Sequence, residues 1–593
     1  MDCPTTAVVA LIGYLAGSIP FAWLIGWVFG GVDIRKIGSG NAGASNLRRV
    51  PGCEKFYVPA ILLDALKGLG AFYIARWMGL PVSWQLFCGF CAEVGHCYPV
   101  WLKFQGGKGV ATFLGVALAA NPALALVALA TFVVLKKKKG YSSLASVVVA
   151  FVFSTLFSFM ACGAGVAGSS CIALVGWVWL IFVLILWGHI LNLNLIKLGY
   201  EPSSKQPRRS VYWGFLVHPT TDVPDYLKNY FVKKSQKFER LPNWFFNLIL
   251  GPFLFTFLPA VFIRPATFWN REMRGDREFR RPSFGLVLPM PMGPSFMMRH
   301  QWFALWAISR LIRLAAMAGA THVGLGAYTA IVGDKGSIVR NRFEGRIKVT
   351  TGDEYTAYLA VDSIPLACKK MGKDITGCNL LVIGTGGVGS AAAMLAALKL
   401  SVARILLYNR TPEKAYQLKQ YIQQDRAHDF VTRNIEVYED LDEALAEADI
   451  IISATSSAKA LKFRAVMLKR GAIVCDIARP RDFEVNRDDV LVYDGGMAAC
   501  KGAQLPSLLG LPEELSFGCL FQTQALGSAR EMEHVGSVGG EYDLDEILYI
   551  AKICDPCSDG VGALRNGDEG IYTDEQIAQI CQAACAARGE RRI

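Results

Sequence analysis

The stretch LLVIGTGGVGS, Leu380 to Ser390, decides the fold of the second half of this chain. A short apolar strand leads into three glycines, Gly384, Gly386 and Gly389, and a run of small residues typical of a buried helix follows. A second apolar strand, Ala403 to Tyr408, comes next. The glycine pattern alone is a weak signal, but between a strand, a helix and a second strand it predicts a Rossmann unit whose glycines hold dinucleotide phosphates.

The residues after the second strand select the dinucleotide. An acidic side chain at this place binds the ribose hydroxyls of NAD, whereas this chain has Asn409, Arg410 and Thr411. A guanidinium and a hydroxyl suit the 2′-phosphate of NADP. The sequence therefore predicts NADPH as the cofactor, bound by Gly384, Gly386, Gly389, Asn409, Arg410 and Thr411.

The first half of the chain is far more apolar. Of 593 residues, 53% are hydrophobic and 19% are charged, which is too polar for an all-membrane protein and too apolar for an ordinary soluble one. Nearly all the long apolar stretches lie before Leu198. We therefore expect an α-helical membrane bundle fused to a soluble α/β reductase with two subdomains, one of them the Rossmann nucleotide-binding domain.

Charge supports a membrane rather than a nucleic-acid partner. The net charge is +12, and in the first half the basic residues gather at the ends of apolar stretches. The inner face of a membrane explains that distribution better than nucleic acid does. We expect membrane lipid as the environment and no nucleic acid as a partner.

Seven transmembrane spans are predicted: Ala7–Phe29, Tyr57–Trp77, Val82–Leu102, Val110–Ala120, Ala123–Leu135, Leu144–Cys162 and Cys171–Trp187. The first run lacks both a preceding basic residue and a clear cleavage site, which favours a span over a signal peptide. If the N-terminus lies outside the plasma (inner) membrane, almost every Lys and Arg falls on the cytoplasmic side. We expect the active sites and the soluble domain, described below, on that side too. The break at Asn121-Pro122 is required, because one continuous helix would place Lys136 to Lys139 outside.

Three polar patches then fall on the same inner face: Gly38–Asn46, Gly106–Gly109, and His189 with Asn192 at the end of the last span. Glycines let backbone N–H groups approach an anion, and Lys108 adds a positive charge at the start of a helix. We interpret the three patches as one phosphate site. The alternative is that the glycines only permit close helix packing in the membrane.

The motifs GSGNAGASN, GHCYPVWLKFQGGKGVAT (Gly95 to Thr112) and HILNLNLIKLGYE (His189 to Glu201), with Asp64-x-x-Lys67-Gly68, carry a resemblance. Residues 1–201 resemble the membrane-bound acyl-phosphate:glycerol-3-phosphate acyltransferase family. The resemblance implies transfer of a fatty acyl group from acyl phosphate to glycerol 3-phosphate, which gives lysophosphatidate.

The resemblance also implies a set of site residues. Ser39 and His189 are expected to be catalytic, with His189 as the base for the glycerol hydroxyl; the alternative for His189 is a helix cap at the interface. The expected phosphate-binding residues are Gly40, Asn41, Gly43, Asn46, Arg49, Gly106, Gly107, Lys108, Gly109 and Asn192. Leu195 stands where the family usually has an arginine, and Arg49, Lys103 or Lys197 could replace that cation.

A second resemblance covers about Val211 to Glu533. Its stretches are VGLGAYTAIVGDKG (Val323 to Gly336), VTTGDEYTAY (Val349 to Tyr358), CDIARP, VYDGGM (Val492 to Met497) and LPEELSFGCLFQTQALG around Cys519. They resemble the long-chain acyl-carrier-protein reductases, which form fatty aldehydes. The resemblance implies that Cys519 accepts an acyl group from acyl-carrier protein or acyl-CoA and that hydride from NADPH reduces the thioester. Without it, any one of the sixteen cysteines is better explained as a small buried residue.

The predicted domain limits are 1–201 for the acyltransferase, 202–210 for a linker, 211–375 for the acyl-substrate subdomain, 376–500 for the Rossmann domain, 501–550 for the catalytic-cysteine segment and 551–593 for the tail. Asn243 to Ile263 is expected to lie on the membrane or to line a lipid tunnel rather than to cross. The cysteines are expected to be mostly reduced. No metal is predicted, although the spacing of Cys554, Cys557, Cys581 and Cys585 leaves zinc open.

Three interpretations of the whole chain remain open. The favoured one is a bifunctional enzyme, an acyltransferase joined to an NADPH-dependent acyl-thioester reductase. In the second, the soluble half only transfers acyl groups to supply the acyltransferase. In the third, it is a non-catalytic NADPH- or lipid-sensing module. A homodimer is compatible with each.

Overall fold

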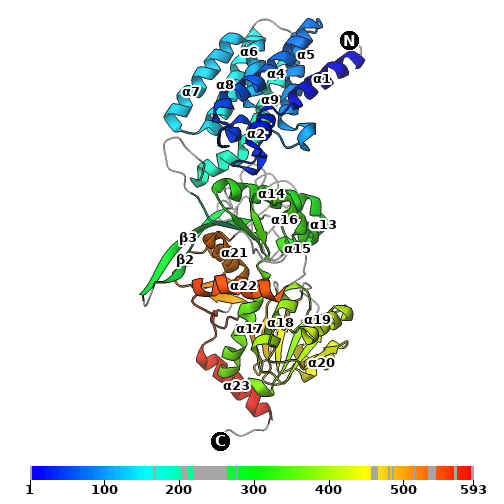
Figure 1. The fold of residues 1–593 in the computed structure, drawn as a ribbon, viewed down its shortest axis with the longest axis vertical. Helices are drawn as coiled ribbons and strands as arrows, with labels where there is room; N and C mark the ends of the chain where they lie inside the picture. The colour runs from blue at the N-terminus through cyan, green and yellow to red at the C-terminus, as the bar shows by residue number, and fades with distance from the viewer. Residues whose placement is uncertain are drawn as a thin grey trace, which may run out of the picture. The chain divides into compact units, whose positions relative to one another are not determined.

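The computed structural model describes residues 3–163, 169–201, 210–217, 263–274, 277–290, 292–326, 328–455, 465–478, 481–483, 487–512, 514–531, 543–566 and 570–588. Two compact units divide the chain, one formed chiefly by residues up to Ser210 and the other chiefly by residues from Val211 onward (Figure 1). Most of the linker 202–210 and of the segment Asn243 to Ile263 lies outside the described residues, as do Arg479 and Pro480 of the CDIARP stretch.

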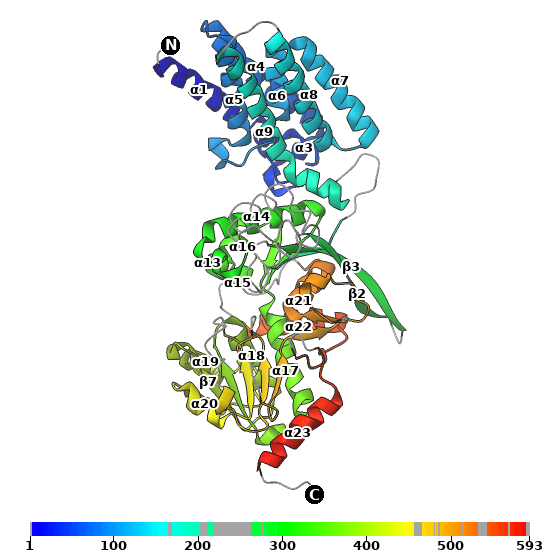
Figure 2. The same ribbon diagram turned by 180° about the vertical axis from the view of Figure 1, so that it is seen from behind.

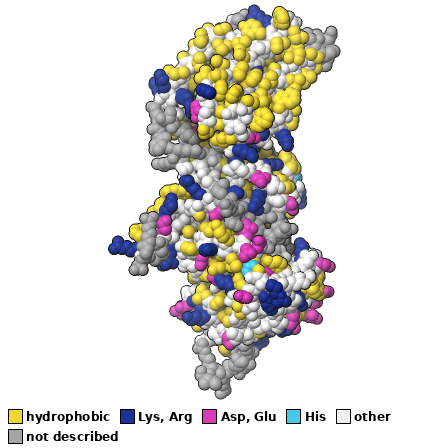
Figure 3. Space-filling view, viewed as in Figure 1, with side chains coloured by type: hydrophobic (Ala, Val, Ile, Leu, Met, Phe, Trp, Pro, Cys, Tyr) yellow, Lys and Arg dark blue, Asp and Glu magenta, His cyan; other side chains and the backbone are white. Residues whose placement is uncertain are grey.

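The membrane unit is a bundle of helices. Its longer helices are α1 (Cys3–Ser18), α2 (Phe21–Gly30), α4 (Tyr57–Trp77), α5 (Val82–Cys97), α6 (Val110–Ala120), α7 (Pro122–Lys139), α8 (Ser142–Gly163) and α9 (Ser169–Leu198), and the short α3 (Ala44–Leu47) lies between α2 and α4. Helix α4 packs on α5 and α6, and α8 packs on α9. Hydrophobic side chains cover much of the visible face of this unit (Figure 3). The exposed hydrophobic residues of the unit include Trp27, Leu126 and Phe159, at 59%, 60% and 74% exposure. Such a surface suits lipid rather than water.

Four stretches of the described residues are long and apolar enough to cross a membrane: Ala7–Gly30, Glu54–Trp77, Ser142–Gly163 and Ser169–Leu198. The seven predicted crossings are therefore not confirmed. Helix α6 has only 11 residues, and α5 ends at Cys97 rather than at Leu102. Helix α7 continues beyond Leu135, the predicted end of its span, through Lys136 to Lys139. Cations at a helix C-terminus interact favourably with the helix dipole.

Two helix breaks arrange the bundle. The predicted break at Asn121-Pro122 is confirmed: the Asn121 side chain caps α7 by accepting from the Leu124 N–H at 3.0 Å, and Pro122 opens that helix. The first predicted span is interrupted between α1 and α2, at Ile19 and Pro20. Pro20 has no N–H to donate, and the Ile19 carbonyl accepts from the Phe21 N–H at 3.2 Å and from Lys67 Nζ at 2.9 Å. This interruption was not predicted.

The soluble unit contains a five-stranded sheet in the order β2-β3-β1-β4-β5. Strands β1 (Trp213–Val217), β3 (Arg277–Pro289), β4 (His322–Leu325) and β5 (Lys348–Thr350) are parallel, and β2 (Arg264–Arg274) pairs antiparallel with β3. The helices along this part of the chain are α13 (Pro294–Arg299), α14 (Gln301–Ala318), α15 (Tyr328–Lys335), α16 (Ser337–Phe343) and α17 (Asp353–Lys370).

A second, six-stranded parallel sheet follows in the order β11-β10-β9-β6-β7-β8. Its strands are β6 (Asn379–Ile383), β7 (Arg404–Tyr408), β8 (Ile435–Tyr438), β9 (Ile450–Ser453), β10 (Ile473–Asp476) and β11 (Leu491–Asp494). Helices α18 (Gly387–Lys399), α19 (Pro412–Gln424) and α20 (Leu441–Glu447) contact these strands (Figure 2). The order reverses at β6, which makes this the Rossmann-like sheet that the glycine stretch predicts.

The described chain ends in smaller elements. Strands β12 (Met497–Ala499) and β13 (Leu515–Phe517) pair antiparallel, and helices α21 (Gly518–Ala529), α22 (Leu544–Cys554) and α23 (Asp574–Arg588) follow. Helix α21 packs on α17, β1 and β4. The segment with Cys519 therefore contacts the first sheet and α17 rather than forming a separate tail.

Candidate functional site

The first polar patch is a turn held by its own side chains. Asn46 organises it: its Oδ1 accepts from the backbone N–H and the Oγ of Ser39, both at 3.3 Å, and its Nδ2 donates to the Asn41 carbonyl at 2.8 Å. Arg49 donates to the same Asn46 Oδ1 at 2.8 Å. Gly38, at φ +57°, leaves no room for a side chain because an ideal Cβ would lie 1.7 Å from Arg49 Nη1. The patch thus brings a guanidinium, a hydroxyl and an amide into one small volume.

The second patch is a loop fastened to the end of α5. The N–H groups of Gly106 and Gly107 donate to the carbonyls of Cys97 and His96 at 3.1 and 3.0 Å. The Gly106 carbonyl accepts from the Ala42 N–H at 3.1 Å, which joins the second patch to the first. Gly109, at φ +86°, begins α6 against the buried Glu93, whose Oε1 would lie 1.7 Å from a Cβ there.

Lys108 connects this loop to the third patch. Its Nζ donates to Asn192 Oδ1 at 2.5 Å, and Asn192 Nδ2 donates to the two oxygens of Glu201 at 2.9 and 3.0 Å. Ser143 Oγ also donates to Glu201, at 3.0 Å. Burial lowers the pKa of Lys108 to about 8, with Glu201 opposing that shift and Arg49 adding to it. Burial likewise raises the pKa of Glu201, against Lys108.

His189 lies one turn before Asn192 and is 4% exposed. Its Nδ1 is 2.9 Å from the Ile185 carbonyl, which can only accept, so Nδ1 carries the proton and Nε2 is left as an acceptor. The preceding Gly188 faces Lys108, because an ideal Cβ would lie 3.4 Å from the Lys108 Cα. His189 and Asn192 do not end the helix as expected, since α9 continues to Leu198.

The three patches predicted from distant parts of the sequence are therefore in contact. Gly40 and Gly43 belong to the first turn, with Gly40 at φ +73° and open space at Gly43. Leu195 is fully buried, so the place of the family arginine is filled by packing. Of the three replacement cations, Arg49 acts on Lys108 electrostatically, whereas Lys103 and Lys197 are exposed.

Sequence reasoning missed Glu201, Ser143 and Glu93 as site residues. Glu201 closes the third motif, and Ser143 opens an apolar helix, so each was visible as a polar residue at a helix end. Glu93 gives a different signal, a carboxylate in an apolar helix, and neither of its oxygens has a hydrogen-bond partner among the described residues.

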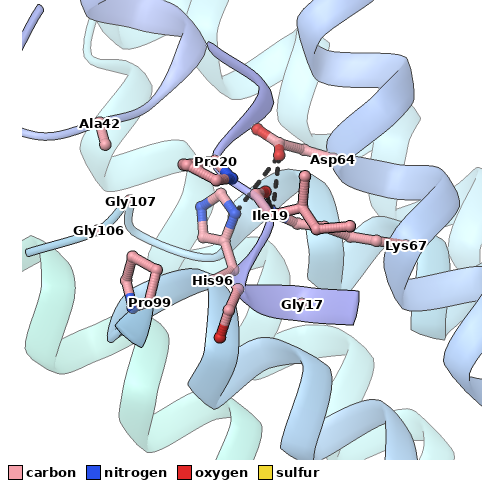
Figure 4. Close-up of a pocket in the computed structure, with 11 residues that line it drawn as sticks. Gly17, Ile19, Pro20, Ala42, Asp64, Lys67, His96, Pro99, Gly106 and Gly107 are labelled. Carbon is pink, nitrogen blue, oxygen red and sulfur yellow. Dashed lines mark hydrogen bonds and ion pairs between the residues drawn. The ribbon is translucent and has the colours of Figure 1, made fainter. Parts of the chain in front are cut away.

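A small pocket adjoins the second patch (Figure 4). It is lined by Gly17, Ser18, Ile19, Pro20, Ala42, Asp64, Lys67, His96, Pro99, Gly106 and Gly107. Asp64 forms an ion pair with Lys67 at 2.9 Å, and its Oδ1 is 3.6 Å from His96 Nδ1. The His96 ring lies under Gly107, where an ideal Cβ would be 2.0 Å from Nε2. This cluster supports both the glycine loop and the interruption between α1 and α2.

In the soluble unit, the three glycines of the nucleotide loop have three different surroundings. Gly384 turns the chain at φ +89°, and a Cβ there would lie 2.8 Å from the Ala454 carbonyl oxygen. A Cβ on Gly389 would lie 1.7 Å from the Gly384 carbonyl oxygen, so only glycine lets α18 pack this closely. A Cβ on Gly386 would meet nothing within 4 Å. That open space at a helix N-terminus fits a dinucleotide pyrophosphate.

Asn409, Arg410 and Thr411 follow β7, on the side of β6 where an adenosine ribose would lie. Asn409 Nδ2 donates to Thr385 Oγ1 at 2.7 Å, which fixes it against the glycine loop. Arg410 and Thr411 are exposed. An acidic residue that would hold the ribose hydroxyls of NAD is absent from these three positions.

Cys519 is the second residue of α21 and is partly buried. Gly352, at φ +73°, packs directly on it, because a Cβ there would lie 2.4 Å from the Cys519 Cα. The Gly518 N–H donates to the Gly496 carbonyl at 2.8 Å, just beyond the carboxyl end of β11. Cys519 is thereby placed at the sheet edge that also carries the glycine loop, with β10 and β9 between β11 and β6.

A buried polar network supports the start of α21. Gln522 Nε2 donates to Glu354 at 2.8 Å, and Gln522 Oε1 accepts from the Tyr355 N–H at 2.9 Å. The stretch around Val349 to Tyr358 and the Cys519 stretch are therefore in contact, although about 170 residues separate them. This arrangement fixes the Cys519 thiol near the carboxyl end of β11.

Three of the four tail cysteines are distributed over two hydrophobic clusters. Cys554 and Cys557 pack with Phe268 and Tyr355, whereas Cys581 packs against Met371. Among the residues that the structure describes, no group of three or more His, Cys, Asp or Glu is arranged to hold a metal ion. Zinc is thus not supported in this part of the molecule.

Comparisons with known proteins give different results for the two units. The family model described as glycerol-3-phosphate acyltransferase matches residues 7–199. The model described as shikimate / quinate 5-dehydrogenase matches residues 365–494, which indicates a Rossmann-like domain of the kind that binds a nicotinamide dinucleotide.

Among the relatives of the membrane unit are two proteins that each carry the name glycerol-3-phosphate acyltransferase. The one from Rhizobium meliloti (strain 1021) is 43% identical over 148 residues, 25% of this chain and 71% of the relative. The crystal structure of PlsY (YgiH), an integral membrane glycerol 3-phosphate acyltransferase, in its glycerol 3-phosphate form is 35% identical, with 34% of this chain and 95% of that chain covered and a TM-score of 0.31. The relative from Myxococcus xanthus (strain DK1622) is 40% identical over 200 residues, 33% of this chain and 96% of the relative. Through its membrane unit, the chain belongs to the glycerol-3-phosphate acyltransferase family.

Proposed function

We propose that the membrane unit transfers a fatty acyl group from acyl phosphate to glycerol 3-phosphate, giving lysophosphatidate and inorganic phosphate. The observation that carries this proposal is the contact of three separate polar patches around Lys108, in a chain that belongs to the glycerol-3-phosphate acyltransferase family. Both substrates carry phosphate and one carries an acyl chain, which suits a cationic, glycine-rich site in an apolar bundle.

Acyl phosphate is already activated, so the protein's task is to position the two substrates and to stabilise charge. Lys108 and Arg49 supply the positive charges, with the Ser39 hydroxyl as a further donor. The N–H groups of Gly106 and Gly107 hold the loop against α5. The attacking glycerol oxygen forms a bond to the acyl carbon while the bond to the phosphate oxygen breaks. His189 Nε2 takes the hydroxyl proton, and the phosphate leaves with its electron pair.

The orientation belongs to the same proposal. The four lysines that end α7 are expected on the cytoplasmic side of the plasma (inner) membrane, with the N-terminus outside. Seven crossings, with α6 and α7 as shorter inner helices, satisfy this arrangement. The acyltransferase site then faces the cytoplasm, since Ser143 and Asn192 lie at the ends of α8 and α9 nearest those lysines.

For the soluble unit, we propose NADPH-dependent reduction of a long-chain acyl thioester to a fatty aldehyde. The Cys519 thiolate attacks the carbonyl of acyl-carrier protein or acyl-CoA, which releases the carrier thiol and leaves an acyl thioester on Cys519. A bound NADPH supplies the hydride. The resulting hemithioacetal on Cys519 collapses to aldehyde and regenerates the thiol.

Two observations support this proposal. The open space at Gly386 accommodates a pyrophosphate, and the start of α21 lies on the opposite side of β6 from Asn409. The glycine loop and Asn409 would hold a dinucleotide, which would supply hydride for the acyl group carried by Cys519. Arg410 is the residue that favours NADPH over NADH. The domain limits 211–375, 376–500 and 501–550 remain part of the proposal, as does a homodimer.

One experiment separates the bifunctional enzyme from its alternatives. Purified full-length protein in detergent is given NADPH and a long-chain acyl-CoA or acyl-carrier protein, and aldehyde is measured. Wild type is expected to form aldehyde, Cys519→Ala to form none, and Cys585→Ala, a matched change in the tail, to behave like wild type. Consumption of no NADPH by wild type would favour the acyl-transfer or sensing alternative.

A further inference from the structure

The apolar hairpin of α8 and α9 carries a pair of cysteines at the end away from the candidate phosphate site. Cys162 lies in the last turn of α8 and Cys171 in the first turn of α9, and their sulfur atoms are 3.2 Å apart. Cys162 is exposed and Cys171 partly buried. A disulfide bond is about 2.05 Å long, so the two sulfurs need to approach by only about 1 Å.

Contacts along the hairpin hold the two cysteines in register. Ser154 Oγ donates to the Val178 carbonyl at 3.3 Å, and Trp179 Nε1 donates to Ser158 Oγ at 3.2 Å. At the far end, Ser143 and Asn192 meet at Glu201. The helices are therefore antiparallel neighbours over their length, and the closeness of Cys162 and Cys171 follows from that packing.

The position of the pair relative to the membrane decides its chemistry. Cys162 lies 19 residues beyond Ser143, and Cys171 lies 21 residues before Asn192. At 1.5 Å per residue, each cysteine is roughly 30 Å along its helix from the phosphate site, about the thickness of a bilayer's hydrocarbon core. If the phosphate site and the lysines of α7 face the cytoplasm, this pair faces the opposite compartment, where thiols are oxidised.

We propose that Cys162 and Cys171 form a disulfide on the outer face of the membrane. The proposal rests on the orientation given under the proposed function. The oxidant is an external protein disulfide: one cysteine thiolate attacks it to form a mixed disulfide, and the other attacks that bond. Two electrons and two protons leave with the oxidant, which becomes a dithiol. The bond joins the end of α8 to the start of α9 and stabilises the hairpin that holds Asn192 and Glu201 at its other end.

The test counts thiols in the full-length protein. Membranes are treated with acid and N-ethylmaleimide to block free thiols, then reduced, and newly exposed thiols are labelled with a maleimide-polyethylene glycol that shifts gel mobility. Wild type is expected to gain two labels, and Cys162→Ser and Cys171→Ser none. Cys557→Ser, a matched change in the soluble unit, is expected to keep both labels. A wild type with no newly exposed thiol overturns the disulfide.

A second measurement tests the compartment separately. In intact cells that express Cys171→Ser, a membrane-impermeant maleimide is expected to label Cys162 without lysis. Labelling that requires lysis overturns the outer location, and with it the proposed orientation, whatever the first measurement gives. Reduction of purified wild type is expected to lower its Tm by a few degrees and to leave acyl transfer within about twofold. Retained acyl transfer keeps failure of the disulfide distinct from failure of the acyltransferase.

Discussion

The candidate site of the membrane unit is formed by side chains, whereas the nucleotide loop of the soluble unit is formed by backbone. Around Lys108, an ammonium, an amide and a carboxylate make hydrogen bonds between distant segments. Around Gly386, the useful property is the absence of a side chain. Removing side-chain atoms is expected to damage the site around Lys108, and adding them is expected to damage the loop around Gly386. The membrane unit is therefore tested by shortening a side chain, and the soluble unit by adding one.

Loss of Lys108 is expected to have the largest effect. Lys108→Ala removes the cation and leaves the Oδ1 of the buried Asn192 without its donor. We expect the change to lower kcat/KM for glycerol 3-phosphate by roughly 10²–10³, about 3–4 kcal/mol. Lys103→Ala, which changes an exposed lysine before the same loop, serves as the matched control. NADPH-dependent aldehyde formation is expected to be unchanged in both. Equal acyl transfer by the two variants would remove Lys108 from the site.

Adding one methyl group distinguishes the glycines of the nucleotide loop. Gly386→Ala fills space that is open in the protein alone, so KM for NADPH is expected to rise roughly tenfold or more while Tm stays within about a degree. Gly389→Ala instead places its Cβ against the Gly384 carbonyl, and Tm is expected to fall by several degrees. Kinetics and thermal unfolding of both variants check this. A Gly386→Ala protein that binds NADPH normally would contradict the pyrophosphate site.

Arg410 sharpens the choice of cofactor. Arg410→Ala is expected to lower the preference for NADPH over NADH by about tenfold, because an exposed charge-assisted contact to a 2′-phosphate contributes about 1–2 kcal/mol. The measurement is kcat/KM with each dinucleotide. Arg433→Ala, which changes an arginine two residues before β8, is the control. Unchanged preference in the Arg410 variant would move the source of selectivity to another residue.

The smallest expected effect is a pH dependence. Because burial lowers the pKa of Lys108 to about 8, its ammonium is charged below that pH and neutral above it. KM for glycerol 3-phosphate is therefore expected to rise by about fourfold between pH 7 and pH 8.5 as the cation is lost. Lys108→Arg keeps its charge over this range and is expected to remove the rise. A flat wild-type profile would show that bound phosphate or Glu201 keeps Lys108 protonated.

Local sequence patterns predicted much of the architecture. The glycine stretch predicted β6, α18 and β7, because a buried parallel strand and its turn are encoded within about 30 residues. Asn121-Pro122 predicted the α6–α7 break, since a capping amide and a proline act on the nearest turn. The meeting of the three polar patches was predicted from their shared side of the membrane.

What sequence patterns missed depends on contacts across the bundle. The interruption at Ile19 and Pro20 is stabilised by Lys67, 48 residues away. Glu201 joins the site through Asn192 and Ser143, whose closeness exists only after α8 and α9 pack. The seven spans were counted from hydropathy and from the positions of Lys and Arg, which do not distinguish a short inner helix from a crossing one. Which face a helix presents, and to which neighbour, is a property of the assembled bundle.

The interruption between α1 and α2 has a consequence for biosynthesis. The Ile19 carbonyl is an acceptor inside an apolar segment, and one of its two donors, Lys67, belongs to α4. A chain emerging from the ribosome presents residue 19 well before residue 67, so the first segment enters the bilayer while this carbonyl has only the Phe21 N–H, at 3.2 Å, as a donor. The second donor to this carbonyl arrives only with α4. We therefore expect the first segment and α4 to be released into lipid together rather than one at a time.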